Sequence, residues 1–261
     1  MTTEKSATTE ISAPAEKSAP AIEVEGLKKS FGKLVVLGGI NLKVPQGGTL
    51  AVLGRSGTGK SVLLKLIIGL QKPDAGSIRI DGEEITGLKL DQLNKLRKRM
   101  GFSFQYSALY DSLSVEENVA FPLRRHSDLK GSQRKERVRE LLEQVGMDGA
   151  LTKLPSEISG GMKKRVGLAR ALALEPEIML FDEPTAGLDP ITAGEINELI
   201  LELQRRHKMS SIVVTHDMHS AKAVSDRVML LDQGQIRIEG SFEDLQKSED
   251  PFVVDFLKHS F

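Results

Sequence analysis

Residues 54–61 of this 261-residue chain read Gly-Arg-Ser-Gly-Thr-Gly-Lys-Ser, which matches the pattern G-x-x-x-x-G-K-[ST] in full. The match follows an apolar run at residues 49–53 and precedes a helical pattern at residues 62–70. Glycines let the backbone curl closely around an anion, and the free N–H groups at the start of a helix point at that anion. A strand, a glycine loop and a helix in this order therefore predict a phosphate-binding loop. The alternative is an ordinary glycine turn before a helix.

The residue types in this loop predict the parts of a nucleotide site. Lys60 reaches the β- and γ-phosphate oxygens, and Ser61 supplies a hydroxyl ligand for Mg²⁺. The rest of the loop is expected to line the phosphates: Gly54, Arg55, Ser56, Gly57, Thr58 and Gly59.

The texture of the chain changes along its length. Residues 1–21 contain a single large apolar residue, Ile11, and predict a solvated tail. From residue 22, short alternating apolar runs between glycines predict antiparallel strands. Near-continuous apolar runs at residues 178–181, 212–214 and 228–231 predict a buried parallel sheet. Residues 88–174 lie between the antiparallel strands and these apolar runs; they are polar and helix-prone and predict an inserted helical subdomain. Residues 246–261 predict a helical end. The fold class is therefore α/β, with a mostly parallel core sheet and an antiparallel β subdomain.

Composition excludes several functions. Lys plus Arg and Asp plus Glu both number 36, so a net charge of 0 gives no support for a nucleic-acid partner. The chain has no Cys, which excludes disulfides, thiolate metal sites and a cysteine nucleophile. No run approaches the ~20 apolar residues that span a bilayer. We therefore expect any membrane role to come through a partner.

Two carboxylates follow the apolar run at residues 178–181. In open parallel sheets, ligands lie beyond the carboxyl ends of the strands, so Asp182 is expected beside the phosphate loop, where it would hold Mg²⁺ directly or through water. Glu183 is placed to accept a proton from the attacking water or to orient it. The alternative is a strand that ends in a solvated acidic turn.

A second helix start is unusual in its charge. Ser159 and two glycines precede a helical pattern at residues 162–174, which makes Ser159 an N-cap. The first turn nevertheless contains Lys163, Lys164 and Arg165, and exposed cations at a helix N-terminus cost roughly 0.3–1 kcal/mol each. Either an anion faces this end, or the basic side chains splay into solvent.

The ordered set of motifs resembles the ATP-binding cassette (ABC) family. The resemblance spans residue 22 to about residue 240 and rests on GRSGTGKS at 54–61, Gln105 after residues 101–104, ISGGM at 158–162, IMLFDE at 178–183, AGLD at 186–189 and His216 after residues 212–215. It implies a P-loop NTPase fold that binds ATP and Mg²⁺ and hydrolyses ATP. Ile158 and Met162 depart from the Leu and Gln that are usual in the family.

The same resemblance implies further roles. Two cassettes pack head to tail, so that ATP on the Lys60 loop of one is capped by residues 159–161 of the other: Ser159, Gly160 and Gly161. Gln105 links Mg²⁺ and water to the membrane partner, His216 contacts the γ-phosphate, and Asp189 couples the two sites. Phe31 stands where the family stacks an aromatic ring on adenine; a buried core Phe is the alternative.

Residues 104–123 and 186–192 look like those of the ATPase subunit of the Mla/Mce systems, which move phospholipids or other lipids between bacterial membranes. Aromatic and aliphatic side chains just after Gln105 suit a groove that accepts a short partner helix: Tyr106, Leu109, Tyr110 and Leu113. The alternative is that they pack into the inserted subdomain's own core.

The resemblance therefore implies a homodimeric ATPase, peripheral on the cytoplasmic face of the bacterial inner membrane. It would drive lipid transport through an integral permease with an MCE-type lipid-binding subunit. One alternative is a non-transporting cassette that transmits force to an envelope or cell-division complex. Another is a DNA-repair or chromosome ATPase, but Lys60 and Ser159 leave room for only one small subdomain, and such enzymes carry a long coiled coil there.

Overall fold

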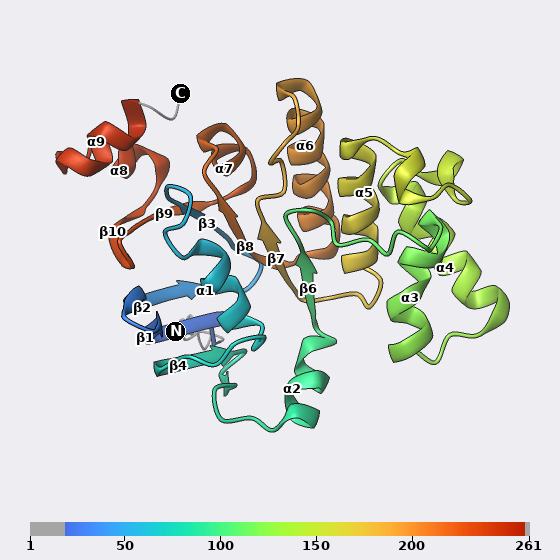
Figure 1. Ribbon diagram of the computed structural model, residues 1–261, viewed down its shortest axis with the longest axis horizontal. Coiled ribbons are helices and arrows are strands. Elements are labelled where there is room, and N and C mark those ends of the chain that lie inside the picture. Colours follow the sequence, from blue (N-terminus) through green and yellow to red (C-terminus); the bar gives the residue numbers. More distant parts are fainter. Residues whose placement is uncertain (1–18, 259–261) are drawn as a thin grey trace, which may run out of the picture.

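A computed structural model describes residues 19–258 and places them in two sheets with surrounding helices (Figure 1). The larger sheet has the order β10-β9-β3-β8-β7-β6 and the smaller the order β2-β1-β4-β5. The strands are β1 (Ile22–Phe31), β2 (Leu34–Val44), β3 (Thr49–Leu53), β4 (Ala75–Ile80), β5 (Glu83–Glu84), β6 (Met100–Ser103), β7 (Ile178–Asp182), β8 (Ser210–Thr215), β9 (Arg227–Asp232) and β10 (Gln235–Gly240). The α-helices are α1 (Lys60–Ile67), α2 (Leu90–Arg97), α3 (Val115–His126), α4 (Gly131–Gln144), α5 (Gly160–Ala171), α6 (Pro190–His207), α7 (Met218–Val224), α8 (Phe242–Gln246) and α9 (Pro251–Lys258).

The larger sheet is parallel from β6 to β9, and β10 joins its edge antiparallel. Every residue of β3, β7 and β8 is buried, which explains the apolar runs at residues 50–53, 178–181 and 212–214 within them. Because these strands run in the same direction, the loops that follow them leave from the same edge of the sheet. The predicted α/β fold with a mostly parallel core is confirmed.

Alternation along each strand divides the core between the two faces of the sheet. On β7, Leu180 belongs to the cluster that includes α1 and the antiparallel sheet, whereas Met179 and Phe181 belong to the cluster built around α3, α4, α5 and α6. Figure 1 shows α1 between the antiparallel strands and the larger sheet, and α3 and α4 at the end of the molecule farthest from α9. The sheet is therefore held on both faces, which fixes the edge that carries the loops.

Residues 88–174, predicted as an inserted helical subdomain, are not helical throughout. Within them β6 pairs with β7 and forms the edge of the larger sheet. Gly101 makes this close approach sterically possible, because a Cβ there would collide with Met179 Sδ and lie 2.8 Å from the carbonyl oxygen of Ala171. Helix α2 comes before β6, and the group of helices in which α3 packs against α4 and α5 comes after it.

The C-terminal helices are integral to the core. Val253 and Phe256 of α9 are buried in a cluster with Leu53 of β3, Leu230 of β9 and Met218 of α7. This cluster covers the part of the sheet that α5 and α6 leave uncovered. Among residues 19–258, no helix combines the length and the apolar character that crossing a bilayer requires.

The N-terminal boundary differs from the predicted one. Ala21 lies within the range predicted to be a tail, yet it is 0% exposed, and its carbonyl oxygen accepts a hydrogen bond from Asp81 N at 3.0 Å. Its small side chain gave no apolar signal, although the neighbouring Ile22 did. Residues 1–18 of the predicted tail lie outside the described residues.

We predict that a chain beginning at Ala19 keeps the stability of the full chain, whereas a chain beginning at Glu23 loses it. The second truncation removes Ala21 and the fully buried Ile22, and loss of an Ile-sized buried side chain costs roughly 2–5 kcal/mol. Urea unfolding of the two truncations beside the full chain measures the difference. Equal midpoints for both truncations would contradict the role of these residues in the core.

Candidate nucleotide-binding and hydrolysis site

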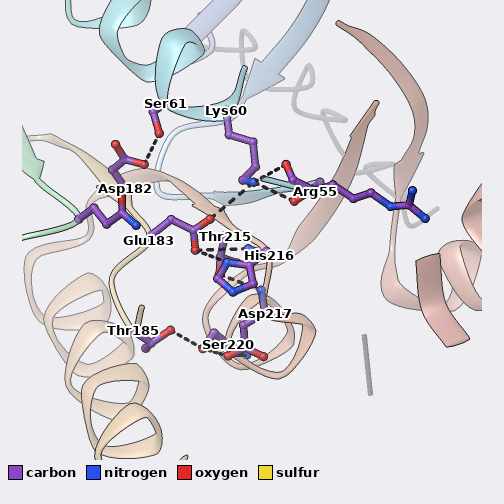
Figure 2. Close-up of polar contacts among 12 residues, drawn as sticks. Arg55, Lys60, Ser61, Asp182, Glu183, Thr185, Thr215, His216, Asp217 and Ser220 are labelled. Atoms are coloured by element: carbon purple, nitrogen blue, oxygen red, sulfur yellow. Dashed lines mark hydrogen bonds and ion pairs between the residues drawn. The ribbon is translucent and has the colours of Figure 1, made fainter. Parts of the chain in front are cut away.

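The loops that follow β3, β7 and β8 meet at one edge of the larger sheet (Figure 2). The loop after β3 is the predicted phosphate loop, and Gly59 is the N-cap of α1 with φ 101°. A Cβ on Gly59 would lie 2.8 Å from Val36 Cγ1, so both its conformation and its contact with β2 favour glycine. The first residue after this turn, Lys60, begins α1 and is buried.

The Lys60 ammonium points into the site (Figure 2). Its Nζ donates to the carbonyl oxygens of Gly54 at 2.8 Å and Arg55 at 3.1 Å and lies 3.5 Å from Glu183 Oε1. Burial lowers the pKa of Lys60, and the charge of Glu183 opposes that shift. A cation held away from water attracts a phosphate oxygen more strongly than a solvated one would.

Ser61 and Asp182 face one another across the end of β7. Ser61 Oγ donates to Asp182 Oδ1 at 2.7 Å. Burial raises the pKa of Asp182, and the hydrogen bond from Ser61 lowers it by a smaller amount. A hydroxyl and a carboxylate are the hard oxygen donors that Mg²⁺ takes, and Mg²⁺ commonly completes its shell with waters and substrate phosphates. The pair therefore fits Mg²⁺ that arrives with a nucleotide.

Glu183 connects the loops after β7 and β8. It is buried, and its backbone has φ 49°, in the left-handed region, with its N–H donating to Val214 O at 2.9 Å. Its Oε2 lies 2.9 Å from His216 Nδ1. An ionised carboxylate only accepts, so His216 Nδ1 is the donor in that contact. The same carboxylate thus contacts Lys60 through one oxygen and His216 through the other.

Lys60, Ser61 and Glu183 border a cavity of about 390 Å³. Its wall includes Lys60, Ser61, Gln105, Glu183 and Phe31. Phe31 is 47% exposed, so the alternative that it is a buried core residue is wrong. The cavity wall therefore combines side chains that suit a phosphate with an exposed aromatic ring.

Two of the three basic residues at the start of α5 have partners within the chain. Lys164 Nζ donates to the carbonyl oxygens of Gln105 at 2.5 Å and Glu183 at 3.0 Å, and Arg165 donates to Val145 O and pairs with Glu195. The alternative that all of them splay into solvent is wrong. Burial lowers the pKa of Lys164. This cation braces the backbone of Glu183, a role that the charge pattern of the helix did not indicate.

Other predicted site residues lie apart from this cavity or face away from it. Ser159 caps α5 by accepting from Met162 N at 3.2 Å, and Asp189 caps α6 by accepting from the N–H groups of Ile191 and Thr192. Neither these caps nor Gly160 and Gly161 are among the described residues that line the cavity. The Arg55 side chain points away from Glu183 (Figure 2) and pairs with Asp255 of α9 at 2.8 Å.

The chain belongs to the ABC transporter family, because the sequence pattern of that family matches residues 37–186. It is therefore an ATPase of the cassette type. It is 43% identical over 237 residues to the intermembrane phospholipid transport system ATP-binding protein MlaF of Haemophilus influenzae, an alignment that covers 91% of this chain and 90% of that protein. It has the same identity over 237 residues to the probable ribonucleotide transport ATP-binding protein mkl of Mycobacterium leprae, of which 68% is covered.

Solved structures of cassettes share the fold. A dimeric post-hydrolysis state of the ATP-binding cassette MJ0796 bound to ADP and Pi superposes with a TM-score of 0.78 at 32% identity, covering 84% of this chain and 98% of that one. The cbiO1 protein of Clostridium perfringens, part of the ABC transporter complex cbiONQ, gives a TM-score of 0.81 at 30% identity, covering 92% and 96%. The predicted cassette fold is thus confirmed.

We predict that Asp182→Asn raises the melting temperature at pH 7 without nucleotide and abolishes the further rise caused by Mg-ATP. Folding raises the pKa of Asp182, so its contribution to the free energy of unfolding falls as pH rises from the unfolded pKa through the folded pKa. At neutral pH the burial of its charge therefore opposes folding. Asn keeps an acceptor for Ser61 without the charge. Thermal unfolding at pH 7 with and without Mg-ATP measures both effects. A lower melting temperature without nucleotide would mean that the Ser61 bond outweighs burial.

Proposed function

We propose that this chain is the ATPase subunit of a bacterial lipid transporter, working as a homodimer on the cytoplasmic face of the inner membrane. An integral permease with an MCE-type lipid-binding subunit would be its partner. The observation that carries the proposal is the convergence of Lys60, Glu183 and His216 with the Ser61–Asp182 pair at one edge of the larger sheet. The alignment with MlaF over 90% of that protein's length supports lipid as the cargo.

The contacts around Glu183 suggest how the residues divide the reaction. Phosphate oxygens would replace the carbonyl oxygens and carboxylate that now surround the Lys60 ammonium, which frees Glu183 to accept a proton from water. His216 Nδ1, bound to Glu183 Oε2, would hold that carboxylate in place. Bound Mg²⁺, held by Ser61, Asp182 and Gln105, would neutralise phosphate charge. Lys60 thus acts on bound ATP, and Glu183 acts on the transition state.

The position of residues 159–161 supports the need for a second chain. Ser159, Gly160 and Gly161 form the start of α5 and do not contribute, among residues 19–258, to the cavity that holds Lys60. Lys164 and Arg165 are turned toward partners within the chain. The first N–H groups of α5, apart from that of Met162, which Ser159 caps, would therefore face an anion brought to this end. A head-to-tail partner would bring these groups onto the ATP.

We predict that Glu183→Gln binds Mg-ATP, turns over at least about 10²-fold more slowly and forms a dimer. Two bound nucleotides would then stabilise one dimer interface, and slow hydrolysis would leave them in place. A ligand at 100 times its Kd stabilises the state that binds it by about 2.7 kcal/mol. Light scattering with Mg-ATP and with ADP measures the mass. Lys60→Ala is the matched control and should stay monomeric, because it removes the ammonium that binds phosphate.

Two outcomes would contradict this prediction in different ways. Unchanged turnover in Glu183→Gln would remove Glu183 as the base. A Glu183→Gln chain that binds Mg-ATP at saturation but remains monomeric would contradict the head-to-tail site while leaving the hydrolytic role intact.

A groove beside Gln105 offers a docking place for the permease. It has a volume of about 360 Å³ and an aromatic wall that includes Phe102, Phe104, Tyr110 and Phe121. Tyr106 is 85% exposed, and the Tyr110 and Phe121 rings lie 4.7 Å apart. Leu109, in contrast, packs against the core cluster of α3, α4 and α5. The alternative that these side chains are core residues thus holds for Leu109 and is wrong for the two tyrosines.

The loop that carries the tyrosines is firmly held. Ser107 and Ala108 have φ values of 60° and 45°, and Arg170 of α5 donates to both of their carbonyl oxygens at 2.6 and 2.7 Å. The buried side chain of Asn118 bonds to the N–H and to the carbonyl oxygen of Tyr110. Exposed rings on a braced loop lose little entropy on binding, which suits an interface.

We predict that Tyr110→Asp lowers retention of the permease at least about tenfold without changing ATP affinity, because an unpaired charge would be desolvated in the contact. Leu90→Asp is the control, since Leu90 is also a large exposed hydrophobic residue, 65% exposed, and lies outside the groove. Co-purification from membranes and nucleotide titration of the same variants measure the two properties. Loss of both would make Tyr110 a structural residue, and full retention would place docking elsewhere.

The cargo is tested on the native complex. Mass spectrometry of the complex isolated from membranes should find a permease, an MCE-type subunit and bound phospholipid. A complex without lipid and without a lipid-binding subunit would overturn the cargo and leave the ATPase assignment standing.

A further inference from the structure

A largely buried hydrogen-bond network joins the segment after β7 to the segment after β8, on the side of Glu183 and His216 that faces away from Lys60 (Figure 2). We call it the hydroxyl network, and its members are Thr185, Asn197, Asp217 and Ser220. Ser220 of α7 is fully buried, and its Oγ lies 3.0 Å from Thr185 Oγ1 and 2.9 Å from Asn197 Nδ2 of α6. The same Ser220 Oγ also bonds to Asp217 Oδ2.

Counting protons fixes the direction of every bond. The Asp217 carboxylate accepts from the N–H groups of His219 and Ser220 at 3.0 and 3.2 Å, and it also accepts from Ser220 Oγ. A serine hydroxyl carries one hydrogen, so its two lone pairs must receive the other contacts. Thr185 Oγ1 and Asn197 Nδ2 are therefore donors to Ser220. The hydrogen-bonding capacity of the Ser220 side chain is fully used.

Two contacts of different character therefore join the two segments. The first is Glu183 to His216, where the histidine side chain is 56% exposed. The second is Thr185 to Ser220, where both residues are buried and neutral. Solvent competes for the exposed His216 end of the first contact. In the second contact the Ser220 hydroxyl is buried and uses all of its hydrogen-bonding capacity, which fixes geometry well, although Asn197 Oδ1 has no partner among the described residues.

The second contact reaches His216 through Asp217. Asp217 caps α7 with its carboxylate, and its own N–H donates to Thr215 Oγ1 at 3.0 Å. The residue between Thr215 and Asp217 is His216, so its backbone is bracketed by two anchored neighbours. Since Ser220 orients the Asp217 carboxylate and Thr185 donates to Ser220, the position of His216 depends on residues that never touch it.

We propose that Thr185 and Ser220 are positioning residues for ATP hydrolysis, because their hydroxyl pair holds His216 opposite Glu183. Thr185 also leads directly into residues 186–189, so a displacement of that segment would be passed to His216 through Ser220. The proposal rests on the roles proposed above for Glu183 and His216.

Thr185→Val and Thr185→Ser separate the hydroxyl from the packing. Val keeps the shape of Thr but cannot donate, whereas Ser donates but lacks the methyl group. We expect Thr185→Val to lower kcat about tenfold or more with KM for ATP within about twofold of the parent, because small misplacements of catalytic groups lower rates strongly. Thr185→Ser should keep kcat within about twofold. Steady-state hydrolysis and equilibrium nucleotide binding measure the two constants.

Thr49→Val is the matched control. Thr49 is equally buried, accepts from Gln204 Nε2 at 3.2 Å and lies at the opposite end of β3 from the phosphate loop. It should lower the melting temperature and leave kcat unchanged. Ser220→Ala extends the test if Thr185→Val unfolds: it should show the same loss of kcat with intact KM, and the double variant should be no worse than Ser220→Ala.

Three results would overturn the proposal: unchanged kcat in Thr185→Val, a Thr185→Ser enzyme as slow as Thr185→Val, or additive losses in the double variant. These are distinguishable from failure of the proposed hydrolytic roles. If Glu183→Gln retains turnover, the role of Glu183 fails. If Glu183→Gln is inactive while Thr185→Val is normal, only the positioning role fails.

Discussion

The parallel pairing of β7 with β8 is the contact on which the site depends. Asp182 lies opposite Val214, and the bond from Glu183 N to Val214 O continues the pairing one residue beyond β7. Glu183 then turns away with φ 49°, a conformation that costs a residue with a side chain roughly 1–2 kcal/mol. Lys164 secures the turn by donating to the Glu183 carbonyl oxygen from α5. The sheet and a helix together therefore impose a backbone conformation that the segment would not adopt alone.

Charge burial follows from this arrangement. Burial lowers the pKa values of Lys60 and Lys164 and raises that of Asp182, so each is held against the preference of its charged form for water. The apolar clusters on both faces of the sheet supply the stability that offsets this cost. In the proposed reaction these charges would act on a phosphate from a site of low polarisability, and they would be in place before the reaction begins.

What the sequence could predict depended on how locally each feature is encoded. The phosphate loop and the Asp182–Glu183 strand end were predictable, because a strand, its loop and its charged residues are contiguous. Ala21 was missed, since a small side chain gives no apolar signal at a boundary. Lys164 stood out as a cation in the first turn of a helix, where cations are unfavourable. Its partners are backbone carbonyl oxygens, and the sequence does not show which residues' carbonyl oxygens will lie near it. The Thr185–Ser220 contact joins neutral residues 35 positions apart, and a lone hydroxyl carries no motif.

The phosphate loop is held in two unequal ways, and the difference bears on how it receives a ligand. From inside, the buried Lys60 ammonium bonds to the carbonyl oxygens of Gly54 and Arg55. From outside, the Arg55 guanidinium pairs with Asp255 and lies 5.4 Å from the centre of the Phe252 ring. If Lys60 binds phosphate as proposed, the inner bonds would be exchanged when phosphate arrives, whereas the outer contacts would not need to change. An exposed ion pair is weak by itself, but α9, which carries Asp255, is anchored in the core by Val253 and Phe256. The outer contacts and the glycine backbone therefore keep the loop in shape while Lys60 changes partners.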